Sequence, residues 1–69
     1  MQEITVIING QSRQIASQTT LDGLLQQLDM ADKRIAVELN GEIVPKSQHP
    51  ATVLQADDRL EIVVAVGGG

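Results

Sequence analysis

The sequence contains no cysteine and no aromatic residue, and these two absences exclude several classes of function. Without cysteine there is no disulfide framework, no thiolate zinc site and no cysteine nucleophile. Without Phe, Tyr or Trp there is no ring on which a nucleobase or a planar cofactor can stack. The core of this 69-residue chain must therefore be built from Ile, Leu, Val and Ala.

Positive charge is scarce as well, with five Lys and Arg against nine Asp and Glu and a net charge of −4. The basic residues are scattered along the chain and form no stripe, which argues against a nucleic-acid partner. An acidic surface suits a basic protein partner, or it serves only to keep the chain soluble.

Long hydrophobic runs are also missing. The longest one, residues 62–66, is far shorter than the about 18 residues that span a membrane. Residues 1–20 lack the basic start and the apolar run of a signal peptide. We therefore expect one cytoplasmic domain with no membrane partner, formed by residues 1–66 and followed by a flexible C-terminal glycine tail, residues 67–69.

The first half of the chain predicts a hairpin followed by a helix. Residues 3–9 alternate between apolar and polar side chains, Asn9-Gly10 favours a tight turn, and residues 11–16 form the returning strand. A helix is expected up to about Met30, because four leucines fall at helical spacing: Leu21, Leu24, Leu25 and Leu28. Thr19 or Thr20 can cap it, and Thr19 with Asp22 resembles a capping box.

The second half predicts strands at residues 35–39, 42–44 and 60–66. A second Asn-Gly pair joins the first two, and the irregular residues 46–55 are anchored by Val53 and Leu54. The apolar last strand should be central and paired on both sides. One amphipathic helix covers one sheet face, which gives an α+β fold. The element order resembles the β-grasp, or ubiquitin-like, fold, with a mixed four- or five-stranded sheet and one main helix packed on one face.

Candidate catalytic groups are few. His49, the only histidine, follows Ser47 in a loop and has no orienting third group, so we interpret it as a surface histidine. Asp57-Asp58 is interpreted as a turn that faces water. One histidine and scattered carboxylates do not make a metal site. The chain also lacks a nucleotide-binding glycine motif, so no catalytic residue, metal or bound cofactor is expected.

The glycine run Gly67-Gly68-Gly69 directly follows the last strand. Such a segment can enter a slot too narrow for any side chain, although a frayed terminus or a cloning remnant would look the same. Beside it, Ile7, Val63 and Ala65 are expected on the outer face of the sheet. We interpret these three residues as a candidate docking patch.

Several segments resemble the ThiS family of sulfur carriers in thiamine biosynthesis. The resemblance is strongest over residues 36–49, which include Asn-Gly-Glu-Ile-Val-Pro, over 57–63, and over the closing Val-Gly-Gly-Gly. It implies a protein substrate and not an enzyme. The carboxylate of Gly69 would be adenylated by an E1-like adenylating enzyme that uses ATP, and Gly67 and Gly68 would carry it into partner active sites. A sulfur-relay donor protein would convert it to a thiocarboxylate, and thiazole synthase would take the sulfur.

Three alternatives remain open at this point. The small subunit of molybdopterin synthase uses the same fold and the same terminal thiocarboxylate. A ubiquitin-like modifier would instead join Gly69 to a target lysine, and a plain binding module would carry an incidental tail. Members of the resembling family with an aromatic residue near the end of the last strand differ from this chain, which leaves the composition of the docking surface open.

Overall fold

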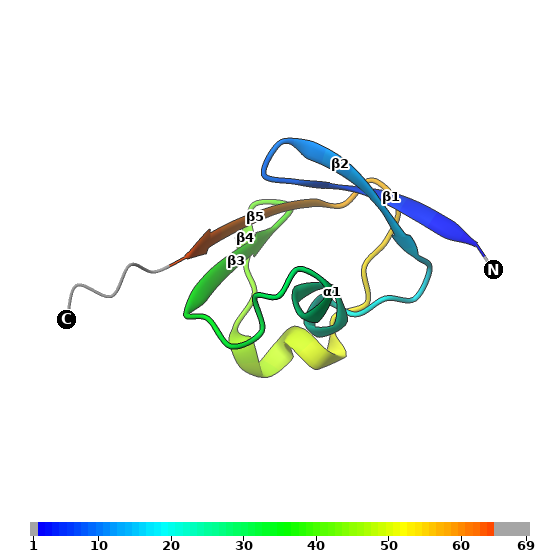
Figure 1. The fold of residues 1–69 in the computed structure, drawn as a ribbon. Coiled ribbons are helices and arrows are strands. Elements are labelled where there is room, and N and C mark those ends of the chain that lie inside the picture. The colour runs from blue at the N-terminus through cyan, green and yellow to red at the C-terminus, as the bar shows by residue number, and fades with distance from the viewer. Residues whose placement is uncertain (1, 65–69) are drawn as a thin grey trace.

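The computed structural model describes residues 2–64, which form a single sheet covered on one face by helices (Figure 1). The elements are β1 (Glu3–Ile8), β2 (Gln11–Ala16), α1 (Leu21–Gln27), β3 (Ile35–Leu39), β4 (Glu42–Ile43), the 3₁₀ helix η1 (Lys46–Ala51) and β5 (Arg59–Val64). The strand order is β2-β1-β5-β3-β4, with β1 and β5 parallel and all other pairs antiparallel. The predicted mixed sheet with one main helix and a central last strand is confirmed.

Both predicted Asn-Gly turns are present. Asn9 and Gly10 have φ of 50° and 83°, and Asn40 and Gly41 have φ of 52° and 89°. Positive φ at both central residues is the signature of the type I′ turn, whose twist matches that of the flanking strands. The turns fix the β1–β2 register, with Ile8 opposite Gln11, and the β3–β4 register, with Leu39 opposite Glu42.

The start of α1 differs from one of the predicted caps. Thr20 is the N-cap, and its hydroxyl accepts a hydrogen bond from the Gly23 backbone N–H at 3.0 Å. The Thr19 hydroxyl instead donates to the Ala16 carbonyl at 2.6 Å. The capping box between Thr19 and Asp22 was therefore wrong, because the helix begins one residue later than that motif requires.

The helix also ends before Met30, at Gln27. Asp29 follows with φ of 60°, its N–H bonds to the Gln26 carbonyl at 3.1 Å, and the Met30 N–H bonds to the Leu25 carbonyl at 2.8 Å. This pair of bonds is a Schellman motif with Asp in the position usually taken by Gly. The motif turns the chain away from the helix axis, while Met30 still packs against the core.

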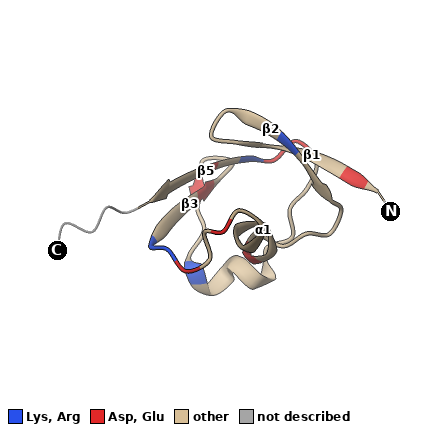
Figure 2. Cartoon of the chain, in the orientation of Figure 1, with Lys and Arg blue, Asp and Glu red and all other residues tan. Residues whose placement is uncertain are grey.

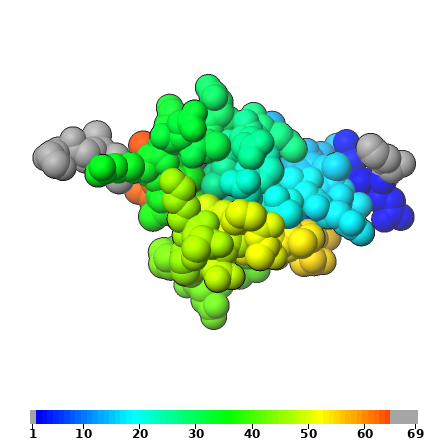
Figure 3. All heavy atoms as spheres, turned by 90° about the horizontal axis from the view of Figure 1, so that it is seen from below, coloured from blue at the N-terminus to red at the C-terminus, as the bar shows by residue number. Residues whose placement is uncertain are grey.

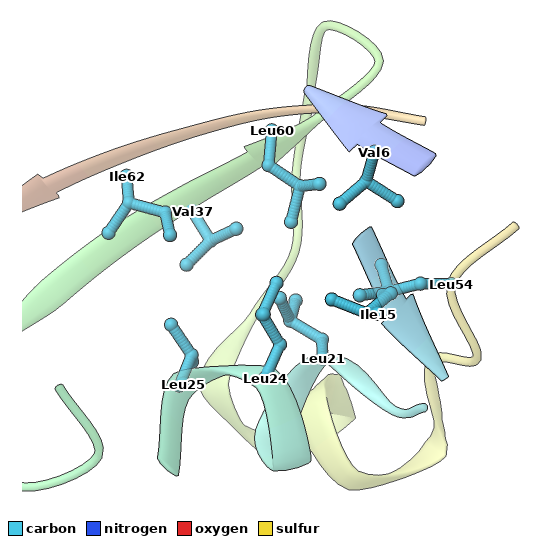
Figure 4. Packing of buried hydrophobic residues seen from close by; sticks show 9 residues of the cluster. All are labelled: Val6, Ile15, Leu21, Leu24, Leu25, Val37, Leu54, Leu60 and Ile62. Carbon is cyan, nitrogen blue, oxygen red and sulfur yellow. The ribbon is translucent and has the colours of Figure 1, made fainter. Parts of the chain in front are cut away.

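The core lies between α1 and the sheet, where nine aliphatic side chains point toward one another (Figure 4). Leu21, Leu24 and Leu25 face upward from α1, and Val6, Val37, Leu60 and Ile62 face downward from the sheet. Leu54 closes one side of the core and is 1% exposed. Val53, the second predicted anchor, holds the segment through its backbone and not through its side chain. Val53 forms an isolated bridge to Thr20, and its side chain is 46% exposed.

Within residues 2–64, the structure has no helix that is both long enough and apolar enough to cross a membrane.

Candidate functional site

The strand that leads to the glycine segment is supported unequally on its two sides. On one side β3 accompanies it over five residues, from Leu39 opposite Leu60 to Ile35 opposite Val64. On the other side β1 pairs with it only at Arg59 and Leu60. The predicted pairing on both sides therefore holds only for the first part of β5. Beyond it, β5 runs on past the end of β1 (Figure 1).

A side chain takes the place of the missing neighbour strand at Ile62. The Asn9 side-chain oxygen accepts a hydrogen bond from the Ile62 N–H at 2.8 Å, and the Asn9 side-chain amide donates to the Ile62 carbonyl at 3.2 Å. The Asn9 backbone N–H also donates to the Leu60 carbonyl at 2.9 Å. Asn9 thus extends the ladder on the β1 side by one residue and holds β5 where it runs past the end of β1.

Replacing Asn9 tests this anchor. Asn9→Ala removes both side-chain hydrogen bonds and puts a Cβ without a polar group at positive φ, so we expect a loss of roughly 2 kcal/mol in the free energy of unfolding. Asn9→Gly is the matched control, because it removes the same hydrogen bonds but suits the positive φ. Urea unfolding should rank the stability as wild type above Asn9→Gly above Asn9→Ala. If Asn9→Ala were as stable as wild type, the amide would not be an anchor.

The sheet face opposite α1 carries the described members of the candidate docking patch. Val63 is 61% exposed, and Ala36 lies directly opposite it on β3. Ile7 is on the same face, but it is in register with Arg59, four residues before Val63. About 13 Å therefore separates Ile7 from the level of Val63 along the strand direction. Ala65 lies outside the described residues.

The centre of this open face is acidic. Glu38 and Glu61 are directly opposite each other on β3 and β5, an arrangement that costs stability in an antiparallel pair. Ile43, paired with Glu38 on β4, is 62% exposed. An acidic pair thus lies between two exposed aliphatic side chains, Val63 and Ile43.

The inward side of β5 is well packed only at its start. Leu60 and Ile62 are buried, but Val64 is 43% exposed. Val66 and the glycines Gly67, Gly68 and Gly69 lie outside the described residues. The structure therefore shows the strand that precedes the glycine segment and not the segment itself.

His49 is not the surface residue that the sequence suggested. Its side chain is 4% exposed, within η1, and its Nε2 lies 3.1 Å from the Val44 carbonyl oxygen. The loop interpretation was wrong because residues 46–51 coil into a 3₁₀ helix that packs against α1. Tight 3₁₀ winding turns the ring inward while its neighbours Gln48 and Pro50 stay exposed.

The Asp58 side chain is hydrogen-bonded within the protein and does not simply face water. Its carboxylate accepts hydrogen bonds from the Gln55 backbone N–H at 2.8 Å and from the Asn40 side-chain amide at 3.0 Å. Asn40 in turn accepts from the Arg59 N–H at 2.9 Å. This network joins the β3–β4 turn to the start of β5, so Asp58 has a structural role. Asp57 has φ of 70° and is exposed.

Comparison with known proteins places the chain in a family. The sequence profile of the ThiS family matches residues 6–69. The chain belongs to the ThiS family. The sulfur carrier protein ThiS of Escherichia coli K12 is 31% identical over 64 residues, which cover 93% of this chain and 97% of that protein. A crystal structure of the thiamine biosynthesis protein ThiS from Geobacter metallireducens superposes with a TM-score of 0.82, at 29% identity, and covers 96% of this chain and all of that one. The β-grasp fold inferred from the element order is thus confirmed.

A second kind of relative is much longer. The thiazole synthase of Paramagnetospirillum magneticum is 41% identical over 64 residues, which make up 93% of this chain but 20% of that protein. The thiazole synthase of Magnetococcus marinus is similar, with 42% identity over 62 residues and 19% of its length. This ThiS-family chain therefore spans about a fifth of the length of these two relatives.

Proposed function

We propose that this protein is a sulfur carrier in thiamine biosynthesis and that the carboxylate of Gly69 is its reactive group. The observation that carries the proposal is the family match, which extends from β1 through the glycine segment to residue 69. The Escherichia coli relative, which matches over almost its whole length, is named a sulfur carrier. The chain acts in this account as a protein substrate and not as an enzyme.

The proposed chemistry requires a partner for each step. A carboxylate is a poor electrophile, so the oxygen of Gly69 first attacks the α-phosphorus of ATP on an E1-like enzyme and pyrophosphate leaves. A persulfide sulfur of a relay protein then attacks the acyl carbon and AMP leaves. A thiol finally cleaves the resulting acyl disulfide, which leaves a thiocarboxylate. Gly67 and Gly68 have no side chains, so they can follow Gly69 into a narrow active site.

The proposed sulfur acceptor is thiazole synthase. Two proteins with that name contain a segment about 40% identical to nearly all of this chain. A carrier and its acceptor that are joined in one polypeptide meet at high effective concentration, which suits two partners of one reaction. This observation favours thiazole synthase over molybdopterin synthase as the acceptor.

The open sheet face is the proposed docking surface for the adenylating enzyme. It lies on the strand that leads to Gly69, and it combines the exposed Val63 and Ile43 with the opposed Glu38 and Glu61. Aliphatic anchors beside a carboxylate pair suit a partner with an apolar, basic-edged surface. The unfavourable Glu38–Glu61 pairing would be relieved by a partner cation.

Placing a charge in this face tests the docking surface. We expect Val63→Lys to raise the KM for this carrier in the adenylation reaction about tenfold or more, because a buried interface position would hold an unpaired charge. Gln27→Lys adds the same charge to the outer side of α1 and should leave the KM unchanged. Equal KM values for the two variants would show that docking uses another face.

Growth rescue tests the proposed pathway. Expression of this chain in a bacterial strain that lacks its own ThiS should restore growth without thiamine. Expression in a strain that lacks the molybdopterin synthase small subunit should not restore molybdenum-cofactor activity. The reverse pattern would assign the chain to the molybdopterin pathway.

A further inference from the structure

Three of the five basic residues meet at one pocket on the helical side of the molecule. Lys33 and Arg34 lie in the connection between α1 and β3, and Lys46 begins η1. All three line a pocket of about 270 Å³. Two of the blue segments in Figure 2 lie near each other below the left end of the sheet. Figure 3 shows this side of the molecule, where the green and yellow parts of the chain adjoin. On a chain with a net charge of −4, this local excess of positive charge is distinctive.

His49 supplies a fourth nitrogen-bearing group to the same pocket. Its Nε2 faces the Val44 carbonyl oxygen at 3.1 Å, and because a carbonyl only accepts, Nε2 carries a proton. Nδ1 makes no hydrogen bond within residues 2–64. The residue is 4% exposed, and its ring forms part of the pocket wall.

The cations at the pocket are not used to stabilise the fold. The side-chain hydrogen bonds within residues 2–64 do not involve Lys33, Arg34 or Lys46. Asp22, the acidic residue of the pocket wall, already accepts from the Gln26 side-chain amide at 3.2 Å. The Asp22 carboxylate offsets one of the three positive charges, so the pocket wall has a net charge of +2, which an anion would balance.

We propose that this pocket binds a phosphate-class oxyanion, either inorganic phosphate or the phosphate group of a small molecule. Three cations match a dianion better than a single carboxylate, and the guanidinium of Arg34 presents paired donors that fit phosphate oxygens. The ring of His49 lies in the pocket wall, where its signals can report on a bound ion. A nucleic-acid backbone is a poorer fit, because the chain has no aromatic residue on which bases could stack.

The pocket lies beside the last described residue of β5. Ile35 lines the pocket and is paired with Val64, the last residue of β5. The site itself rests only on the pocket and its charges and does not depend on the proposed sulfur chemistry.

The NMR signals of the His49 ring can report on binding at this site. The chain has no Phe, Tyr or Trp and a single His. In a ¹H NMR spectrum recorded in D₂O, the two ring C–H protons of His49 therefore give the aromatic side-chain signals of the whole protein. We would titrate inorganic phosphate into the full chain at constant pH and constant ionic strength, with NaCl as the balancing salt. A saturable shift of the His49 ring signals is expected, with a dissociation constant in the millimolar range or below.

Variants that each remove one positive charge show whether phosphate binds at this pocket. Lys46→Ala should weaken phosphate binding about tenfold, the loss of one charge-assisted contact, and Arg34→Ala should weaken it at least as much. Arg13→Ala removes the same charge from β2, outside the pocket, and should leave binding unchanged.

Three results would overturn the proposal: no saturable shift, a shift equal to that given by the NaCl balance alone, or equal weakening by Arg13→Ala. None of them bears on sulfur loading at Gly69, so the two proposals fail separately.

Discussion

A variant that lacks Gly68 and Gly69 should lose all growth rescue in the strain without ThiS, while its domain stays folded. The reactive carboxylate would then belong to Gly67, two residues closer to β5. Two residues of extended chain measure about 7 Å, more than the tolerance of an active site for the position of a reacting group. We therefore expect a loss below detection and not a partial reduction.

The control for this truncation is the stability of the truncated chain towards urea. The buried core cluster of the described residues runs from Val6 to Ile62, so we expect the urea midpoint of the truncated chain to equal that of wild type. A chain with Gly68→Ala tests access separately, because it keeps the length and adds one Cβ. If the truncated chain still rescued growth, it would be a binding module with an incidental tail, and the carrier proposal would be wrong.

Leu24→Ala should have the largest effect on stability among single aliphatic truncations of α1. Leu24 is fully buried, and it points from α1 into the centre of the cluster beneath Leu60 (Figure 4). Truncating a buried leucine to alanine costs about 2–5 kcal/mol. A domain of this size is stable by roughly 3–10 kcal/mol, so much of the folded population is at risk. Chemical or thermal unfolding followed by circular dichroism would measure the loss.

Gln27→Ala provides the matched comparison on the same helix. Gln27 is exposed, and alanine favours helix, so its unfolding free energy should change by less than about 0.5 kcal/mol. A loss of less than about 1 kcal/mol for Leu24→Ala would mean that α1 does not form the core with the sheet as described.

Local sequence patterns predicted most of the fold because their causes are local. The Asn-Gly pairs determine the two hairpins, since positive φ is needed at both turn positions. The leucine spacing predicts which side of α1 is buried. The end of α1 was harder to predict, because Asp29 takes a left-handed conformation that is commoner for glycine. His49 was misjudged because its burial depends on η1 packing against α1, which no short pattern reveals.

The geometry of the candidate site could not be predicted from the sequence. The glycine segment is evident in the sequence, and the reactive role proposed for Gly69 comes from the family resemblance. The amide contacts of Asn9 join residues 53 positions apart and depend on strand register, which a single sequence does not give. The same holds for the four-residue offset between Ile7 and Val63 and for the pocket formed by Lys33, Arg34 and Lys46.

Intact-mass spectrometry tests the central proposal most directly. The purified chain is incubated with its E1-like enzyme, ATP and a persulfide donor, and its mass is compared with that of a reaction without ATP. A thiocarboxylate at Gly69 replaces one oxygen with sulfur, so the mass should rise by about 16 Da and fragmentation should place the change on the last residue. An unchanged mass with an active cognate enzyme, or a gain located elsewhere in the chain, would contradict the proposal that Gly69 carries the sulfur.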